Sequence, residues 1–166
     1  VLICPTRTAY GELCRIITNA RRRSPKGEYS LAQWDLKTVK HCLMIWLPKG
    51  EWDTDEEWAH WLGKHYAGRL WIGLQRHLVA NEQSYIKHCN KLSHLFELPI
   101  TACGGVLMHT ASRQPLQHLL SAIRHRTTVA QLGRSLLPNA ERCLRSKDKL
   151  NRLFKSEYMD ESVSIA

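Results

Sequence analysis

Short apolar runs alternate four times with segments of helical periodicity, and no other feature of the sequence constrains the fold as strongly. The segments that follow the apolar runs repeat apolar side chains every three or four positions, as in residues 9–23, 54–68, 81–96 and 115–123. Alternation of this kind is typical of a parallel β-sheet or barrel with helices packed against it. We therefore predict an α/β domain whose chemistry lies at the C-terminal ends of its strands. The expected strands span residues 1–5, 42–48, 69–74 and 99–108.

Polar residues at fixed spacings mark where several of these helices should begin. A Ser or Thr followed three positions later by Glu or Gln has the pattern of a capping box. Proline suits the first turn of a helix, because the N–H that it lacks has no partner there. The predicted starts are Ser30 with Gln33, Thr54 with Glu57, Asn81 and Pro115. After residue 134 the pattern predicts a loop followed by short basic helices.

One glycine lies where a strand should place a packing side chain. Gly73 interrupts the apolar run WIGLQRHLV, residues 71–79, although glycine adds no packing to a strand and costs backbone entropy. A pair of adjacent glycines occurs in the next expected strand, within TACGGVLMH, residues 101–109. Because the ends of neighbouring parallel strands meet at one edge of a sheet, Gly73 and this pair should have a common explanation.

The charge of the chain favours a polyanionic partner. Lys and Arg number 24 against 15 Asp and Glu, which gives a formal net charge of +9. Basic clusters occur at residues 21–27, 124–126 and 142–152. Such clusters could bind phosphates, or they could simply be solvated helix faces. No zinc finger or other nucleic-acid-binding motif is present, so any contact with DNA should be non-specific.

Cysteine usage and hydropathy indicate the cellular compartment. The six cysteines form no CxxC pair and lie in apolar contexts, so we expect reduced thiols in the cytosol instead of disulfides or a zinc site. No apolar run approaches the roughly 20 residues of a membrane span, and no secretory signal is visible. The chain opens with Val directly inside an expected strand, so we expect it to be a fragment of a longer protein.

Acidic and aromatic clusters have plain structural interpretations. Asp53, Asp55, Glu56 and Glu57 could suggest a metal site, but the start of a helix explains them through the helix dipole. The six tryptophans could form a stacking platform for single strands, although most lie on expected core stripes. Neither cluster alone indicates a function.

Several stretches resemble bacterial C-family DNA polymerases of the error-prone branch. The most specific is PNAERCLRS, residues 138–146, within a tail that resembles the join between a PHP (polymerase and histidinol phosphatase) domain and the palm. The stretches PTRTAYGELCRIITNARRRSPKGEYSL and LQRH resemble the same branch. The resemblance implies a PHP-type irregular β/α barrel. Here it would be a partial barrel over residues 1–125, followed by a basic segment, 126–166, that leads toward the palm.

The resemblance also explains the glycines. Family members with an intact metal centre carry Glu-Leu-Gln-Arg-His in the strand that corresponds to 71–77, and Asp-x-His in the next one. Here Gly73 stands at the Glu position, Gly105 at the Asp position and Leu107 at the His position. Glycine and leucine offer no ligand atom, so the phosphoesterase centre should be lost. His77 and His109 remain as surface or supporting histidines, or as residual metal contacts. We therefore expect no catalytic residue and no cofactor in this chain, with a divalent metal, Mg²⁺, only in the parent polymerase.

Three functional hypotheses follow from the sequence. The first is a structural and partner-binding module of an error-prone DNA polymerase that acts in translesion synthesis and SOS-type repair in the cytoplasm. Its partners would be DNA, the rest of the polymerase chain and subunits of a mutagenesis complex, with no membrane. The alternatives are an active PHP phosphoesterase or proofreading exonuclease, and a stand-alone basic nucleic-acid-binding domain. The expected DNA contacts are Arg21, Arg22, Arg23, Arg142, Arg145 and Lys147.

Overall fold

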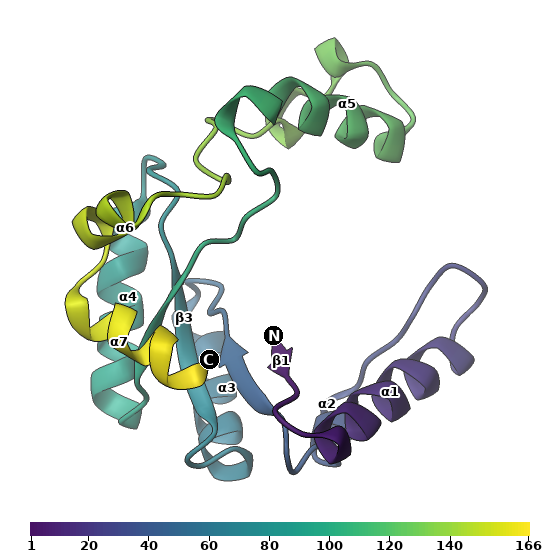
Figure 1. Ribbon diagram of the computed structural model, residues 1–166. Helices are drawn as coiled ribbons and strands as arrows, with labels where there is room; N and C mark the ends of the chain where they lie inside the picture. Colours follow the sequence, from purple (N-terminus) through teal and green to yellow (C-terminus); the bar gives the residue numbers. More distant parts are fainter.

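The computed structural model describes residues 1–166 as a mixed α/β fold built on one four-stranded sheet (Figure 1). The strands lie in the order β1-β2-β3-β4, and β2, β3 and β4 are parallel. Their bounds are Leu2–Ile3, Leu43–Trp46, Leu70–Gln75 and Ile100–Cys103. The α-helices are α1 (Arg7–Arg22), α2 (Gln33–Leu36), α3 (Trp52–His65), α4 (Glu82–Phe96), α5 (Gln114–His125), α6 (Lys147–Leu153) and α7 (Ser156–Ile165). Three 3₁₀ turns are η1 (Ala111–Arg113), η2 (Val129–Gln131) and η3 (Gly133–Ser135).

The predicted α/β class is confirmed, but the predicted barrel is not. The sheet is open, with β1 at one edge and β4 at the other. Four strands fall well short of the roughly eight at which a barrel interior is just wide enough for side chains. The first strand also differs from the expectation, since β1 has two half-buried residues and pairs antiparallel with β2. The last strand ends at Cys103, so Gly105 and Leu107 lie beyond it and not within a run to residue 108.

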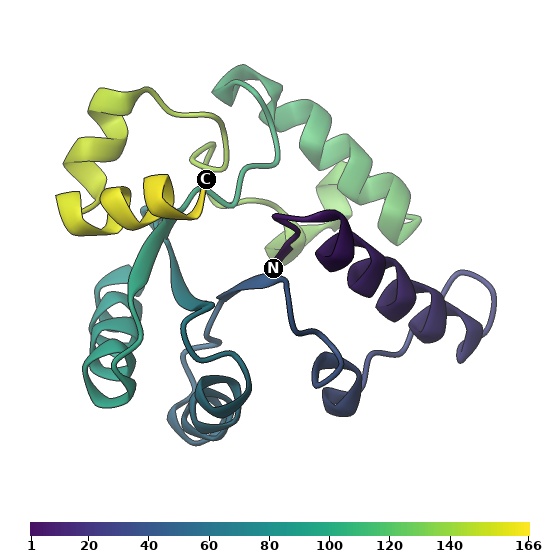
Figure 2. The same ribbon diagram turned by 60° about the horizontal axis from the view of Figure 1, so that its bottom comes forward.

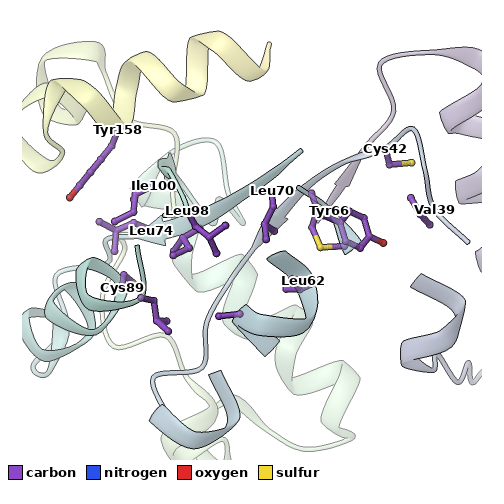
Figure 3. Packing of buried hydrophobic residues seen from close by; sticks show 14 of the residues in the cluster. Val39, Cys42, Leu62, Tyr66, Leu70, Leu74, Cys89, Leu98, Ile100 and Tyr158 are labelled. Atoms are coloured by element: carbon purple, nitrogen blue, oxygen red, sulfur yellow. The ribbon is translucent and has the colours of Figure 1, made fainter. Parts of the chain in front are cut away.

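The main core lies between one face of the sheet and helices α3 and α4. Leu74 of β3, Ile100 of β4 and Leu62 of α3 belong to this core (Figure 3). Ile72 and Leu92 are fully buried members of the same cluster. Burying such side chains is the dominant stabilising contribution, at about 1.5–3 kcal/mol each. Apart from the buried Gly73, buried and half-buried residues alternate along β3, as the period of two in a strand predicts.

Helix α7 covers the opposite face of the sheet, as Figure 2 shows with α3 and α4 below the strands and α7 above. Trp71 of β3 donates from its indole nitrogen to Glu161 over 2.7 Å. Thr101 of β4 shares a hydrogen bond of 2.9 Å with Ser162. The C-terminal helix is therefore an integral layer of the fold.

Helix α5 stands away from the sheet (Figures 1 and 2). Its main contacts are with the 3₁₀ turns η1 and η2. As a result, its apolar stripe is open to solvent, and Leu120 and Ile123 are 53% and 65% exposed. No helix of the structure combines the length and the apolar character that a membrane crossing would need.

Some of the predicted helix starts are confirmed. Asn81 occupies the N-cap position of α4, and Pro115 lies in the first turn of α5. Helix α3 begins at Trp52, before the predicted Thr54, because the Asp55 carboxylate inside its first turn accepts the backbone N–H groups of Lys49 and Gly50. Those bonds complete the turn ahead of the expected capping box.

The capping box predicted at Ser30 is wrong as well. Helix α2 begins at Gln33, and the N-cap position is Ala32. The Asp35 carboxylate accepts the Ala32 backbone N–H over 2.8 Å, so a residue inside the helix satisfies the cap.

Candidate functional site at the strand ends

Gly73 leaves no vacant ligand position in β3. It is buried and pairs with Thr101 of β4 in the parallel register. A Cβ placed on Gly73 would lie 2.6 Å from Leu47 Cδ2, 2.7 Å from Ile45 Cγ2 and 3.1 Å from Cys103 Sγ. Neighbouring side chains thus occupy the space into which a side chain at this position would project, and Leu47 and Ile45 would have to shift to admit one.

Gly105 lies just beyond β4 and against the end of β3. Its φ is +54°, a left-handed conformation that favours glycine. A Cβ on Gly105 would lie 2.8 Å from His77 Nε2 and 3.0 Å from the Gln75 side-chain amide. The structure therefore brings Gly105 and His77 together, with Gly73 two residues before Gln75 on the same strand. Leu107 is 44% exposed, and its backbone N–H donates to Arg142 O over 2.8 Å.

A buried carboxylate of α4 holds the loop that follows β3. Glu82 is 6% exposed and accepts the backbone N–H groups of His77 and Leu78 over 2.5 and 2.7 Å. The Arg76 guanidinium donates to Glu82 Oε2 over 2.9 and 3.1 Å. This network fixes Leu78 in a left-handed conformation, with φ +52°, and so fixes the direction of the His77 backbone.

The tail segment 138–146 ties the strand ends together through backbone oxygens. Asn139 donates to His77 O over 2.8 Å, Arg142 to Gly105 O over 2.8 Å, and Arg145 to Arg76 O over 2.6 Å. An isolated parallel bridge between Met108 and Cys143 adds a backbone contact. No local pattern in the sequence indicates these bonds, because they join positions 37 to 69 residues apart.

The two remaining histidines have different surroundings. Burial lowers the pKa of His77 below its usual 6.5, the bond from its ring to Gly104 O opposes that shift, and the charges of Arg142 and Arg145 lower the pKa further. His109 is exposed and takes part in no side-chain hydrogen bond. No group of three His, Cys, Asp or Glu side chains is placed to hold a metal ion.

Comparison with known proteins adds a decisive observation. Over its whole length, the chain is similar to error-prone DNA polymerases. It is 60% identical over 166 residues to the error-prone DNA polymerase of Vibrio vulnificus strain YJ016, and 55% identical to that of Vibrio parahaemolyticus. The corresponding protein of Pseudomonas savastanoi is 40% identical over 169 residues. The chain spans 16% of the length of each of these relatives. No protein-family model matches the chain.

An apolar groove of about 810 Å³ is lined mainly by residues of α1, β2 and α3 and of the loops beside them. Its 18 lining residues include 15 hydrophobic ones, with Arg21 and Lys49 among the others. Several apolar side chains at this groove are exposed, with Leu31 at 49% and Tyr29 at 72%. Exposed apolar surface of this extent is typical of an interaction site.

The predicted DNA contacts are not equally available. Arg23 forms a two-pronged ion pair with the buried Asp35, at 2.8 and 3.0 Å, and stacks on Trp34. The Arg145 side chain is 2% exposed and is engaged with the strand-end backbone. Arg142 is half-buried, with its Nε on Gly105. The exposed members of the predicted set that lack a side-chain hydrogen bond are Arg21, Arg22 and Lys147.

Proposed function

We propose that this chain is a PHP-type structural module of an error-prone DNA polymerase, and that it hydrolyses no phosphoester itself. The observation that carries the proposal is 60% identity, across all 166 residues, to a protein named error-prone DNA polymerase. At that level of identity two chains share a fold, and the aligned regions occupy the same part of the architecture in both proteins. Nucleotidyl transfer, lesion bypass and DNA repair would be activities of the whole polypeptide.

The residues at the strand ends do not fit a catalytic metal centre. Gly73, Gly105 and Leu107 have no donor side chain, and Gly105 is packed against the imidazole of His77. Two guanidinium groups lie near that imidazole and depress its pKa, and the same positive field would repel a divalent cation. One half-buried histidine and one exposed histidine give weak binding at most. This donor set supports a structural role in place of metal-assisted hydrolysis.

The apolar groove supplies a surface for the structural role. We assign its occupant to the rest of the same polymerase polypeptide, because the match covers only 16% of the relative's length, so the relative is about six times as long as this chain. Groove residues such as Ile17 and Leu31 remain half-exposed here, at 47% and 49%. Burying such side chains would release about 25 cal/mol per Å² of apolar surface. The exposed stripe of α5 would be covered in the same way.

Contacts with DNA form a second part of the proposal. The formal charge of +9 and the exposed Arg21, Arg22 and Lys147 favour phosphate binding without base recognition. Partners in a mutagenesis complex and a cytoplasmic location remain predictions from the sequence resemblance.

The structural role is tested with charge placed in the groove. In the whole polypeptide that contains this chain, an Ile17→Asp/Leu31→Asp double variant should lower primer extension and increase cleavage by a low dose of protease. The matched control is Leu95→Asp, which changes a side chain of similar exposure, 55%, on α4. A double variant that keeps full primer extension and protease resistance would show that the groove does not contact the rest of the polypeptide. The proposed structural role of the groove would then be wrong.

A further inference from the structure

Two of the six cysteines bring their sulfur atoms into contact. Cys4 Sγ and Cys42 Sγ are 3.8 Å apart, and no other pair of sulfurs is within hydrogen-bonding reach. Cys4 follows β1 directly and is half-buried, while Cys42 precedes β2 and is fully buried. All six cysteines are free thiols in the structure.

The strand register places these two residues opposite each other. Leu2 pairs with Met44 and Ile3 with Leu43, so the next antiparallel partners are Cys4 and Cys42. The ladder bonds fix which kind of pair this is. Val1 and Ile45 exchange two backbone bonds, of 2.7 and 2.9 Å, so they form a hydrogen-bonded pair. Because such pairs alternate along an antiparallel ladder, the cysteines stand three steps further on at a non-hydrogen-bonded position.

That position has the backbone spacing that a disulfide needs. Opposed residues at a non-hydrogen-bonded position have Cα atoms about 4.5 Å apart, and disulfides bridge Cα atoms from about 4.4 to 6.8 Å apart. Closing the sulfur–sulfur gap from 3.8 Å to a bond then requires side-chain rotation and a small separation of the strands. No rearrangement of the sheet is needed.

We propose that Cys4 and Cys42 are a redox-modifiable pair, which a small-molecule disulfide of the glutathione type converts to an intramolecular disulfide. The Cys4 thiolate attacks one sulfur of the oxidant, whose S–S bond breaks and releases one small thiol. Cys42 then loses its proton and attacks the Cys4 sulfur of the mixed disulfide, which releases the second small thiol. The two protein thiols are oxidised, and the small disulfide is reduced to two thiols.

The surroundings of the two sulfurs set this order. The attacking group must be an accessible thiolate. Burial raises the pKa of Cys42 to about 11, and its thiol donates to Ala9 O over 3.3 Å, so Cys42 is held protonated and away from solvent. Cys4 is partly open to solvent and is the sulfur that meets the oxidant first.

The bond would restrain one wall of the apolar groove. Strand β1 has two residues and leads directly to Thr6, which caps α1. Helix α1 contributes Leu13, Ile16 and Ile17 to the groove. A disulfide that ties the entry of α1 to β2 therefore fixes the position of this wall against the sheet. The modification is independent of the proposed polymerase role, since it depends only on β1, β2 and α1.

The test is a map of disulfide-linked peptides. The whole polypeptide is purified under reducing conditions, incubated natively with oxidised glutathione, alkylated and cut with trypsin. Arg7, Arg15, Lys40 and Lys49 are cleavage sites that place Cys4, Cys14 and Cys42 in three separate peptides. We expect a linked pair that carries Cys4 and Cys42, lighter than the two free peptides by two hydrogen atoms, which a reductant separates again.

Matched variants make the result decisive. Cys4→Ser should leave Cys42 reduced after the same treatment, because the buried Cys42 reacts only with the mixed disulfide that forms at Cys4. Cys14→Ser, a change in the half-buried cysteine of α1, should leave the Cys4–Cys42 link intact. Cys42→Ala, which keeps the buried site apolar, should leave Cys4 as a mixed disulfide with glutathione. The proposal is overturned if Cys4 and Cys42 remain fully alkylated after native oxidation, or if Cys4 is linked to Cys14 instead.

Discussion

Gly105 lies against the imidazole of His77, so close that a Cβ on the glycine would stand 2.8 Å from Nε2. The two residues belong to the loops after β4 and β3, and the positive φ of Gly105 makes this approach possible. A carboxylate at this position would require His77 to move or the backbone to change its conformation. The strand ends are therefore packed for direct contact between loops, and the left-handed backbone of Gly105 is what makes that contact possible.

Filling this contact should destabilise the fold. Gly105→Ala forces a left-handed conformation and a close contact on a side chain, and we expect a loss of about 1–3 kcal/mol in the free energy of unfolding. The control is Gly11→Ala, at an exposed position inside α1 with open space around it, which should stabilise by about 0.5–1 kcal/mol. Urea unfolding of the two variants measures both effects. Equal stability of Gly105→Ala and wild type would contradict the close contact.

The buried Glu82 should be worth far more than a surface acid. Glu82→Gln leaves the Arg76 charge without its partner and weakens the bonds to His77 and Leu78, so we expect a loss of about 3–5 kcal/mol. Glu157→Gln is the matched change in an exposed pair with Lys155, and it should cost less than about 1 kcal/mol. Thermal unfolding of both variants ranks them. Similar losses in the two would mean that the network around Glu82 is not formed.

The ion pair of Asp35 should make stability depend on acid pH. The hydrogen bonds from Arg23 hold the pKa of Asp35 below its usual 3.8, and the Ala32 N–H lowers it further. A lowered carboxyl pKa contributes stability above the unfolded value and loses it as pH falls through the folded value. Arg23→Gln should therefore be less stable than wild type at pH 7, and the gap should close well below pH 3.8. A gap of constant size across this range, measured by urea unfolding, would rule out the linkage.

DNA binding should depend on the free arginines and not on Arg23. The chain should bind single- and double-stranded oligonucleotides weakly, and Arg21→Ala/Arg22→Ala should lower the slope of log affinity against log salt by about two. Arg23 is left out of the double variant, because its loss would also unpair Asp35. Fluorescence titrations at several salt concentrations give the slopes. If the double variant binds with an unchanged slope, the cluster at residues 21–23 does not contact phosphates.

Local sequence patterns predicted the elements of the sheet better than their connections. The alternation of apolar runs located β2, β3 and the start of β4, because a buried strand needs continuous apolar residues. The direction of β1 was not predictable in this way, since a two-residue strand takes its orientation from the loop and helix that follow it. The early start of α3 depends on Asp55, whose bonds to Lys49 and Gly50 replace a capping box.

Sequence comparison related Gly73 to Gly105, but it did not indicate the contacts around them. Gly73 and Gly105 were identified as related positions from the resemblance, and the structure places both near Gln75 at adjoining strands. What the sequence could not provide is that Arg142 and Arg145 donate to backbone oxygens of the strand-end loops. The sequence does not distinguish an arginine on the surface from one whose side chain is buried and hydrogen-bonded. Only the tertiary structure shows which of the two it is.

The proposed role, a polymerase module that hydrolyses no phosphoester itself, is tested most directly with a primer that has a mismatched 3′ end. The primer is annealed to a template and incubated with the whole polypeptide and Mg²⁺ or Mn²⁺. Without nucleotides we predict that the primer keeps its length, and with nucleotides that it is extended. A primer that shortens without nucleotides, and stays intact with a His77→Ala/His109→Ala variant, would contradict the claim and place an active phosphoesterase at these strand ends.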